Sequence, residues 1–180
     1  MEPVELLVAG ETVAPELLAD VSTLPHPARV IGVFRRADLP EYEPRPVALA
    51  LWRVADPGNV GTLIRTADAF GASVELSAGT ADPTGPKALR ASAGALFRVP
   101  LGEAAGRRIA LVAHGGRPLA EVDLEPPVVF VLGSEREGLP EEVLATCDEA
   151  ATIPTPGASE SLNVGAAGAI ALYEWSRRDG

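Results

Sequence analysis

Five consecutive apolar residues, 128–132 (VVFVL), run directly into a glycine-bounded segment, 133–138 (GSEREG). A run of this length is long enough for a buried strand and too short for a buried helix. In open α/β sheets, ligands bind at the carboxyl ends of the strands, where this turn is predicted to lie. A second strand-like segment, 150–153, is interrupted by 154–157 (PTPG), and a helix is predicted to begin near Ser161. The two turns predict one pocket built mainly from backbone groups.

Strand-like and helix-like segments alternate from residue 47 to the end of the chain. The alternation indicates an α/β fold with a mostly parallel sheet of about six strands and helices on both faces. Asp56 or Asn59 is expected to cap the first of these helices. The extended segments are 47–51, 74–77, 96–101, 109–113, 128–132 and 150–153, and the helices are one that follows the turn 56–59, then 87–95 and 161–178.

The first 40 residues differ in character from the remainder. They read as a helix, 14–21, followed by a strand, 30–34, and then a proline-rich and charged linker, 41–46. This segment is too short to form a hydrophobic core of its own. It is therefore interpreted as a remnant or as the end of a larger domain. The main domain is expected to span 47–180.

Composition narrows the class of protein. The chain is 47% hydrophobic, and its acidic start lacks the basic region of a secretory signal. The single cysteine, Cys147, excludes an internal disulfide and a cysteine-cluster metal site, and a cytoplasmic location is expected. A formal net charge of −10 argues against a general nucleic-acid coat, so any polyanion site must be local.

Several chemistries lack their residue patterns. The chain has no GxGxxG after a first strand and no GxxxxGK[ST] loop, the two common phosphate cradles. Ser134 is not in a GxSxG turn, and the two histidines offer little support for a Ser-His-Asp triad. His26 is interpreted as a surface residue, and His114 as a loop or packing residue with pocket lining as the alternative. No metal site is predicted.

Five polar positions remain as candidates for chemistry. Arg65 lies in an otherwise apolar helical segment and either pairs with an anion or faces solvent. Asn59 is first a helix cap, and Glu135 is either a pocket carboxylate or an exposed turn residue. Ser161 and Asn163 open a helix, where capping is the first expectation. Asn163, however, is predicted to lie inside the first turn, where its amide is freer to face a ligand.

Three segments occur in a characteristic order: 56–71 (DPGNVGTLIRTADAFG), 131–139 (VLGSEREGL), and a third that runs from 153 (IP) through 161 (SLNV) to 171 (ALYE). With the auxiliary segment 87–100, they resemble the SpoU branch of the SPOUT (TrmH-like) RNA ribose 2′-O-methyltransferases. The resemblance covers 47–178. Residues 1–40 also resemble the tail of the L30e-like substrate-binding domain found in many members.

The resemblance implies a carboxy-terminal trefoil knot, which the sequence pattern alone could not have predicted. It also implies S-adenosylmethionine as cofactor and a homodimer formed through the knot, with the active site at the interface. The cofactor-binding positions carried over from the family are Ala113, Leu132, Gly133, Ser134, Gly138, Ile153, Pro154, Ser161 and Leu162.

The family's catalytic arginine corresponds to Arg65, with Asn59, Glu135, Ser161 and Asn163 as supporting positions. A guanidinium is a poor base, so the expected role of Arg65 is to stabilise the developing ribose 2′-alkoxide and hold the adjacent phosphate. The chain departs from the family at Arg136, where the residue is usually small. Arg136 is expected either to contact RNA or to face solvent.

The resulting prediction is an S-adenosylmethionine-dependent RNA 2′-O-ribose methyltransferase that acts on rRNA in preference to tRNA. Two alternatives belong to other classes. One is a non-catalytic knotted module for RNA binding or ribosome assembly. The other is a flavodoxin-like nucleotide-binding domain with coincidental motifs. The sequence does not identify the nucleotide that is modified, or whether a longer substrate-binding domain precedes this chain.

Overall fold

The computed structural model describes residues 2–22, 26, 28–157 and 161–179. The chain folds into two compact units, one that ends at Leu39 and one that begins at Pro40. No helix in these described ranges is long and apolar enough to cross a membrane.

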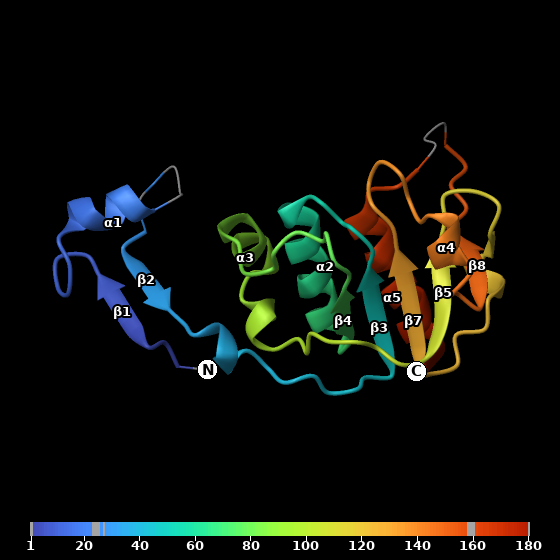
Figure 1. The fold of residues 1–180 in the computed structure, drawn as a ribbon, viewed down its shortest axis with the longest axis horizontal. Helices are drawn as coiled ribbons and strands as arrows, with labels where there is room; N and C mark the ends of the chain where they lie inside the picture. The colour runs from blue at the N-terminus through green and yellow to red at the C-terminus, as the bar shows by residue number, and fades with distance from the viewer. Residues whose placement is uncertain (1, 23–25, 27, 158–160, 180) are drawn as a thin grey trace. The chain divides into compact units, whose positions relative to one another are not determined.

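The first unit contains two strands and a short helix. Strands β1 (Glu5–Val8) and β2 (Val30–Val33) pair in antiparallel orientation, and α1 (Pro15–Val21) lies between them in sequence, as Figure 1 shows. The sequence reading missed β1, because Glu5-Leu6-Leu7-Val8 has neither the β-branched content nor the alternation that marks a strand. Leu18 is 1% exposed, whereas several other apolar side chains of the unit are exposed.

The second unit is built on a parallel sheet. Among the described residues, six strands form it in the order β4-β3-β7-β5-β8-β6, and every neighbouring pair is parallel. This arrangement confirms the predicted α/β class. The strands are β3 (Val47–Leu51), β4 (Ser73–Leu76), β5 (Arg107–Leu111), β6 (Arg117–Pro118), β7 (Val128–Leu132) and β8 (Glu149–Thr152).

One predicted extended segment was wrong. Residues 96–101 do not form a strand of their own, since Ala95–Phe97 is a 3₁₀ turn and Leu101 makes only an isolated bridge to Val74. The sixth strand is instead β6, which consists of two residues. A proline and an arginine carry no strand pattern, so β6 is held in place by its pairing with β8.

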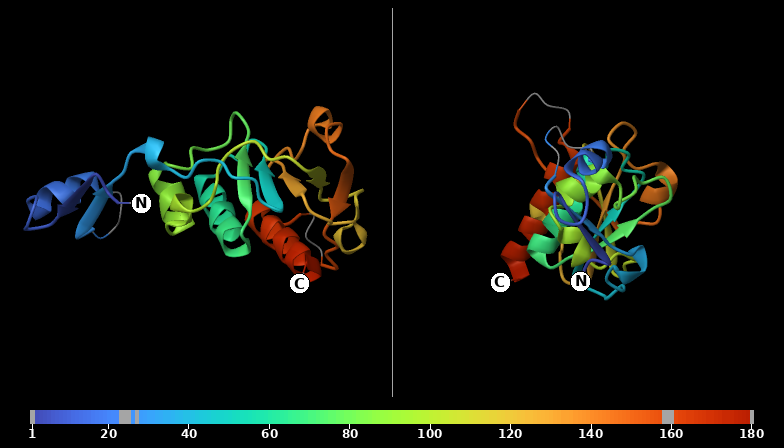
Figure 2. Two further views of the ribbon diagram at one scale, coloured as in Figure 1. Left: turned by 90° about the horizontal axis from the view of Figure 1, so that it is seen from below. Right: turned by 90° about the vertical axis from the view of Figure 1, so that its left-hand side faces the viewer.

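Helices lie on both faces of the sheet, and Figure 2 shows α2 (Pro57–Phe70) and α5 (Val164–Asp179) on the same side. The short helix α3 (Pro86–Ser92) packs against α2. On the opposite face, Val143 of α4 (Glu141–Leu144) packs with the alanines of β3 and the valines 129 and 131 of β7. Because alternate strand residues point to opposite faces, Leu49, Phe130 and Leu132 pack toward α2 and α5.

The helix starts show which polar side chains act as caps. Asp56, and not Asn59, caps α2: its Oδ1 accepts hydrogen bonds from the backbone N–H groups of Gly58 at 2.6 Å and Asn59 at 3.0 Å. Helix α5 begins at Val164, later than predicted, because Asn163 is its cap. Its Oδ1 accepts from the backbone N–H groups of Gly165 and Ala166. The prediction that Asn163 lies inside the first turn was therefore wrong.

Candidate functional site

A cavity of about 600 Å³ opens at the carboxyl ends of β5, β7 and β8. Figure 1 shows the loops after β5 and β7 and the segment before α5 at this end of the sheet. Both predicted turns contribute residues to its wall. The lining residues are Leu111, Val112, Ala113, Leu132–Leu139, Ile153, Thr155, Ser161, Leu162, Asn163, Val164 and Ala167.

Eight of the nine positions proposed to bind cofactor line this cavity. They are Ala113, Leu132, Gly133, Ser134, Gly138, Ile153, Ser161 and Leu162. Pro154 does not line it and is exposed, because Ile153 and Thr155 on either side turn toward the space. The segments that follow β5, β7 and β8 thus line one cavity. That these residues bind a cofactor stays a prediction.

The turn after β7 is closed by a pair of backbone hydrogen bonds. The Ser134 N–H donates to the Gly138 carbonyl at 3.2 Å, and the Gly138 N–H donates to the Ser134 carbonyl at 3.0 Å. Gly138 has a φ of +67°, which favours glycine. A Cβ on Gly133 would collide with the backbone of Gly138 and lie 2.6 Å from the Leu139 nitrogen. The turn can therefore close only if residue 133 has no side chain.

Three polar side chains connect this turn to the starts of α2 and α5. Glu135 accepts hydrogen bonds from the Asn59 side-chain amide at 2.8 Å and from the backbone N–H groups of Ala55 at 3.2 Å and Asp56 at 3.3 Å. The Asn163 amide in turn donates to the side-chain oxygen of Asn59 at 3.1 Å. Asn59 does not line the cavity itself, but it joins two residues that do.

This network also sets the ionisation of Glu135. Partial burial acts to raise the pKa of its carboxyl group. Hydrogen bonds from the Asn59 amide and from nearby backbone N–H groups outweigh burial, so the pKa lies below its usual value. Glu135 is consequently a carboxylate that holds backbone and amide donors, which makes it a poor candidate for a proton donor or acceptor at neutral pH.

Replacing Glu135 with glutamine is expected to lower the free energy of unfolding near neutral pH by about 1 kcal/mol, since exposed charge-assisted hydrogen bonds are weaker than buried ones. In the folded protein the pKa of the Glu135 carboxyl group lies below 4.5, the ordinary value of a glutamate side chain. The carboxylate therefore stabilises the fold fully above that value, and the contribution is lost as the pH falls through the folded-state pKa. Thermal unfolding of both proteins as a function of pH measures this: the difference should narrow in acid.

Glu137→Gln is the matched control. Glu137 lies in the same turn, and its carboxylate makes no hydrogen bond to any described residue. This variant should unfold like the parent protein at every pH. A difference for Glu135→Gln that stays constant from neutral to acid pH would contradict the stabilising role of the ionised carboxylate.

Arg65 stands apart from the other candidates. It is exposed on α2, does not line the cavity, and makes no ion pair or hydrogen bond to any described residue. Of the four supporting positions, Glu135, Ser161 and Asn163 line the cavity, and Asn59 is hydrogen-bonded to two of them. His114 is exposed and outside the lining residues.

The sequence reading missed several residues of the cavity wall. Leu111 and Val112 line it because β5 ends two residues earlier than predicted, and earlier placement of that strand end would have identified them. Thr155, Val164 and Ala167 carry no pattern that separates them from loop and helix positions. Within the described residues, no group of three or more histidine, cysteine, aspartate or glutamate side chains could hold a metal ion.

Comparison with protein families gives one match over most of the chain. The model of the SpoU rRNA Methylase family matches residues 46–173. A curated relative, an uncharacterized tRNA/rRNA methyltransferase from Synechocystis, is 34% identical over 92% of this chain and 66% of its own length. A 23S rRNA uridine 2′-O-methyltransferase from Streptomyces viridochromogenes is 37% identical over 70% of this chain and 50% of its own length. The chain thus spans between half and two thirds of these curated relatives.

Solved structures give the same result. An AdoMet-bound rRNA methyltransferase from Sinorhizobium meliloti superposes with a TM-score of 0.81 and 32% identity, covering 91% of this chain and 69% of that chain. A SpoU methyltransferase from Streptomyces viridochromogenes in complex with AdoMet superposes with a TM-score of 0.76 and 27% identity, covering 93% of this chain and 72% of that chain.

Proposed function

Because the chain belongs to the SpoU rRNA methylase family, we propose that it is an S-adenosylmethionine-dependent methyltransferase that modifies a ribose 2′-hydroxyl group in RNA. The observation that carries this proposal is the joining of all three family motifs at one cavity. The turn 133–138 and the segment before α5 form the wall, and Asn59 of the first motif is hydrogen-bonded to both.

The cavity fits the proposed cofactor. Its volume of about 600 Å³ lies in the usual range for small-molecule sites. The backbone of Gly138 lies so close to Gly133 that a side chain on residue 133 would have no room. Main-chain groups of such a wall can hydrogen-bond the edge of an adenine ring. When bound, S-adenosylmethionine would supply a methyl group already activated on a sulfonium. The protein's residues position the ribose oxygen and stabilise the negative charge that develops on it as the hydroxyl proton passes to water.

The protein's own residues have separate tasks in this proposal. The Arg65 guanidinium stabilises negative charge as it develops on the ribose 2′-oxygen and holds the neighbouring phosphate. Glu135, Asn59 and Asn163 position the turn after β7 against the starts of α2 and α5. Positioning supplies much of the rate, because the attacking oxygen must lie in line with the bond that breaks.

We also propose a homodimer formed through a carboxy-terminal knot. Two observations support the dimer. Arg65 lies outside the cavity of its own chain, so a second chain is needed to bring an arginine to it. Helix α5 leaves Ile170 and Tyr173, which are three residues apart and so on one side of the helix, exposed at 38% and 59%, and this apolar pair is available to a second chain.

Ribosomal RNA is the proposed substrate class, with tRNA as the second candidate. The support is the 23S rRNA specificity named for the Streptomyces relative and the likeness of residues 1–40 to an L30e-like domain. A non-catalytic knotted module is less well supported, because Asn59, Arg65, Glu135 and Asn163 are all present. A degenerate copy would be expected to lose some of them.

The test measures methyl transfer to RNA and then locates the methyl group by alkaline hydrolysis of the product. The protein is incubated with methyl-labelled S-adenosylmethionine and, separately, with rRNA and tRNA from a strain that lacks its gene. A 2′-O-methyl group removes the nucleophile of alkaline RNA hydrolysis, so we expect label in alkali-resistant dinucleotides from rRNA. Label in mononucleotides would indicate base methylation instead. If calorimetric titration shows that the protein binds S-adenosylhomocysteine, but no methyl group is transferred to either RNA, the non-catalytic alternative is supported.

A further inference from the structure

Most cationic side chains of the second unit are paired with carboxylates. Arg53, Arg65 and Arg136 differ, because they make no ion pair to any residue that the structure describes. Arg65 already has a proposed role, which leaves two arginines to explain. Among the described residues, the ion pairs of the unit are Arg45–Glu43, Lys87–Asp56, Arg98–Asp68, Arg107–Asp123, Arg107–Glu149, Arg108–Glu75, Arg117–Glu121, Arg117–Glu149, Arg177–Glu174 and Arg178–Glu174.

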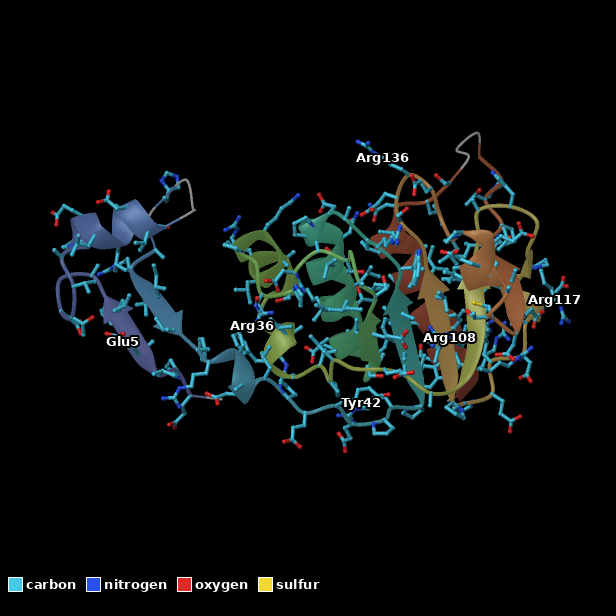
Figure 3. All side chains as sticks on the ribbon, in the orientation of Figure 1. Glu5, Arg36, Tyr42, Arg108, Arg117 and Arg136 are labelled. Carbon is cyan, nitrogen blue, oxygen red and sulfur yellow. The ribbon has the colours of Figure 1, made fainter. Side chains whose placement is uncertain are left out.

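Arg53 and Arg136 follow neighbouring strands of the sheet. Strands β3 and β7 pair with Leu51 opposite Leu132, and the Trp52 N–H donates to the Leu132 carbonyl at 2.8 Å. Arg53 comes two residues after the end of β3, and Arg136 lies in the turn after β7. Figure 3 shows Arg136 extended from this turn. Both arginines are therefore at the end of the sheet that carries the cavity.

Hydrogen bonds tie the two arginine-bearing segments together. Glu135, which precedes Arg136, accepts from the backbone N–H of Ala55, two residues after Arg53. Arg136 itself lines the cavity. The segments that carry the two arginines are thus joined through Glu135, whose contact with Asn59 belongs to the proposed active site. A strand of RNA placed with a ribose at the cavity would meet them with its flanking phosphates.

The backbone of Arg53 is in an unfavourable conformation. Its φ is +50°, in the left-handed region, where a side chain brings Cβ close to the following carbonyl oxygen. Glycine would avoid this cost. Residues held in this way cluster at ligand-binding positions, so the presence of an arginine here indicates a use for its side chain.

The Arg53 side chain is also held in place. Its guanidinium carbon lies 5.5 Å from the centre of the Trp52 ring, and Trp52 packs against the buried cluster of β3 and β7. The Arg53 stem passes over Gly79, where an added Cβ would lie 3.4 Å from its Cγ. A guanidinium stacked on an aromatic ring keeps its in-plane N–H groups available for bidentate binding of phosphate. The donor is therefore oriented before a ligand arrives.

We propose that Arg53 and Arg136 form a two-point clamp for backbone phosphates of the substrate RNA on either side of the methylated nucleotide. This inference rests on the proposed function, and it names the contacts with which an acidic protein holds RNA. With a formal net charge of −10, the chain repels a polyanion overall. Because phosphate contacts dominate RNA affinity, binding requires local unpaired cations such as these two.

The test measures RNA affinity and its salt dependence without requiring methyl transfer. The probe is a fluorescein-labelled, mixed-sequence single-stranded RNA, titrated with the full chain saturated with S-adenosylhomocysteine at several salt concentrations. Arg53→Gly and Arg136→Ala are each expected to weaken binding by about three- to tenfold and to reduce the slope of log K against log salt by about 0.7. Arg53→Gly should also unfold at the same or a higher temperature, since glycine relieves the backbone strain.

Arg45→Ala is the matched control. It removes the same charge from the other end of β3, where Arg45 is paired with Glu43, and it should leave both affinity and slope unchanged. The proposal is wrong if the arginine variants keep the parent slope, if Arg45→Ala lowers it equally, or if the parent protein does not bind the RNA. It is also wrong if these variants change only the oligomeric state, which would indicate a protein-binding surface. If the parent protein binds the RNA and the two arginine variants show the expected change in slope, but the parent does not transfer a methyl group, only the proposed function is contradicted.

Discussion

Replacing Arg65 with alanine is expected to reduce methyl transfer by about 10²- to 10³-fold, since this is the cost of removing one preorganised donor from a developing oxyanion. Affinity for S-adenosylhomocysteine should change by no more than about threefold, because Arg65 does not line the cavity. Single-turnover transfer to RNA measures the first quantity and calorimetric titration the second. The side chain is exposed and unpaired, so thermal stability should not change.

Two further variants separate the proposed role from a general loss of charge. Arg65→Lys keeps a positive charge without the planar fork and should recover only part of the activity. Arg98→Ala removes a guanidinium that is paired with Asp68, a residue of the helix that also carries Arg65. This variant should keep methyl transfer within about twofold of the parent. Full activity in Arg65→Ala, or an equal loss in Arg98→Ala, would remove the electrostatic role from Arg65.

The buried strands were predictable, whereas the small elements were not. Strands β3 and β7 are buried at every residue, so each reads as an uninterrupted apolar run, and their boundaries were predicted correctly. Strand β6 and helix α4 have two and four residues, too few for a period to show. Their structure depends on the elements against which they pack, and this is information that a local pattern does not contain.

The candidate site shows the same division. The turns were predictable, because glycine and proline restrict the backbone locally. Asn59 donates a hydrogen bond to Glu135 and accepts one from Asn163, and these residues are 76 and 104 positions away, so only the fold brings them together. The role of Asn163 as a cap followed from the true start of α5, three residues after the predicted one. The placement of Arg65 outside the cavity of its own chain had no signal in the sequence.

Replacing Gly133 with alanine is expected to weaken S-adenosylhomocysteine binding by about 10- to 100-fold, which corresponds to an overpacking cost of about 1–3 kcal/mol. The added Cβ would collide with the Gly138 carbonyl group and the Leu139 nitrogen. These are backbone atoms, so the whole turn must open, and the two hydrogen bonds between Ser134 and Gly138 must lengthen. Calorimetric titration measures the affinity for S-adenosylhomocysteine. Thermal unfolding measures how far the substitution also lowers the stability of the fold.

Gly157→Ala is the control for this substitution. It makes the same chemical change in the loop that follows β8, at a glycine where no described residue other than its chain neighbours has an atom within 4 Å of an added Cβ. Both affinity and stability should match the parent protein. Unchanged affinity in Gly133→Ala would show that the turn after β7 is not part of the cofactor site. An equal loss in Gly157→Ala would show that the loss does not come from the collision.

Mixing the Gly133→Ala and Arg65→Ala chains, at an S-adenosylmethionine concentration too low to fill the Gly133→Ala cavity, tests whether the active site is shared between chains. A Gly133→Ala chain keeps Arg65, and an Arg65→Ala chain keeps an intact cavity. If the arginine of one chain serves the cavity of the other, a mixed dimer contains one complete site. Random equal mixing should then restore about one quarter of the parent activity per chain, since half of the dimers are mixed and each has one working site of two. If Arg65 instead serves its own chain, no complete site forms and mixing restores nothing.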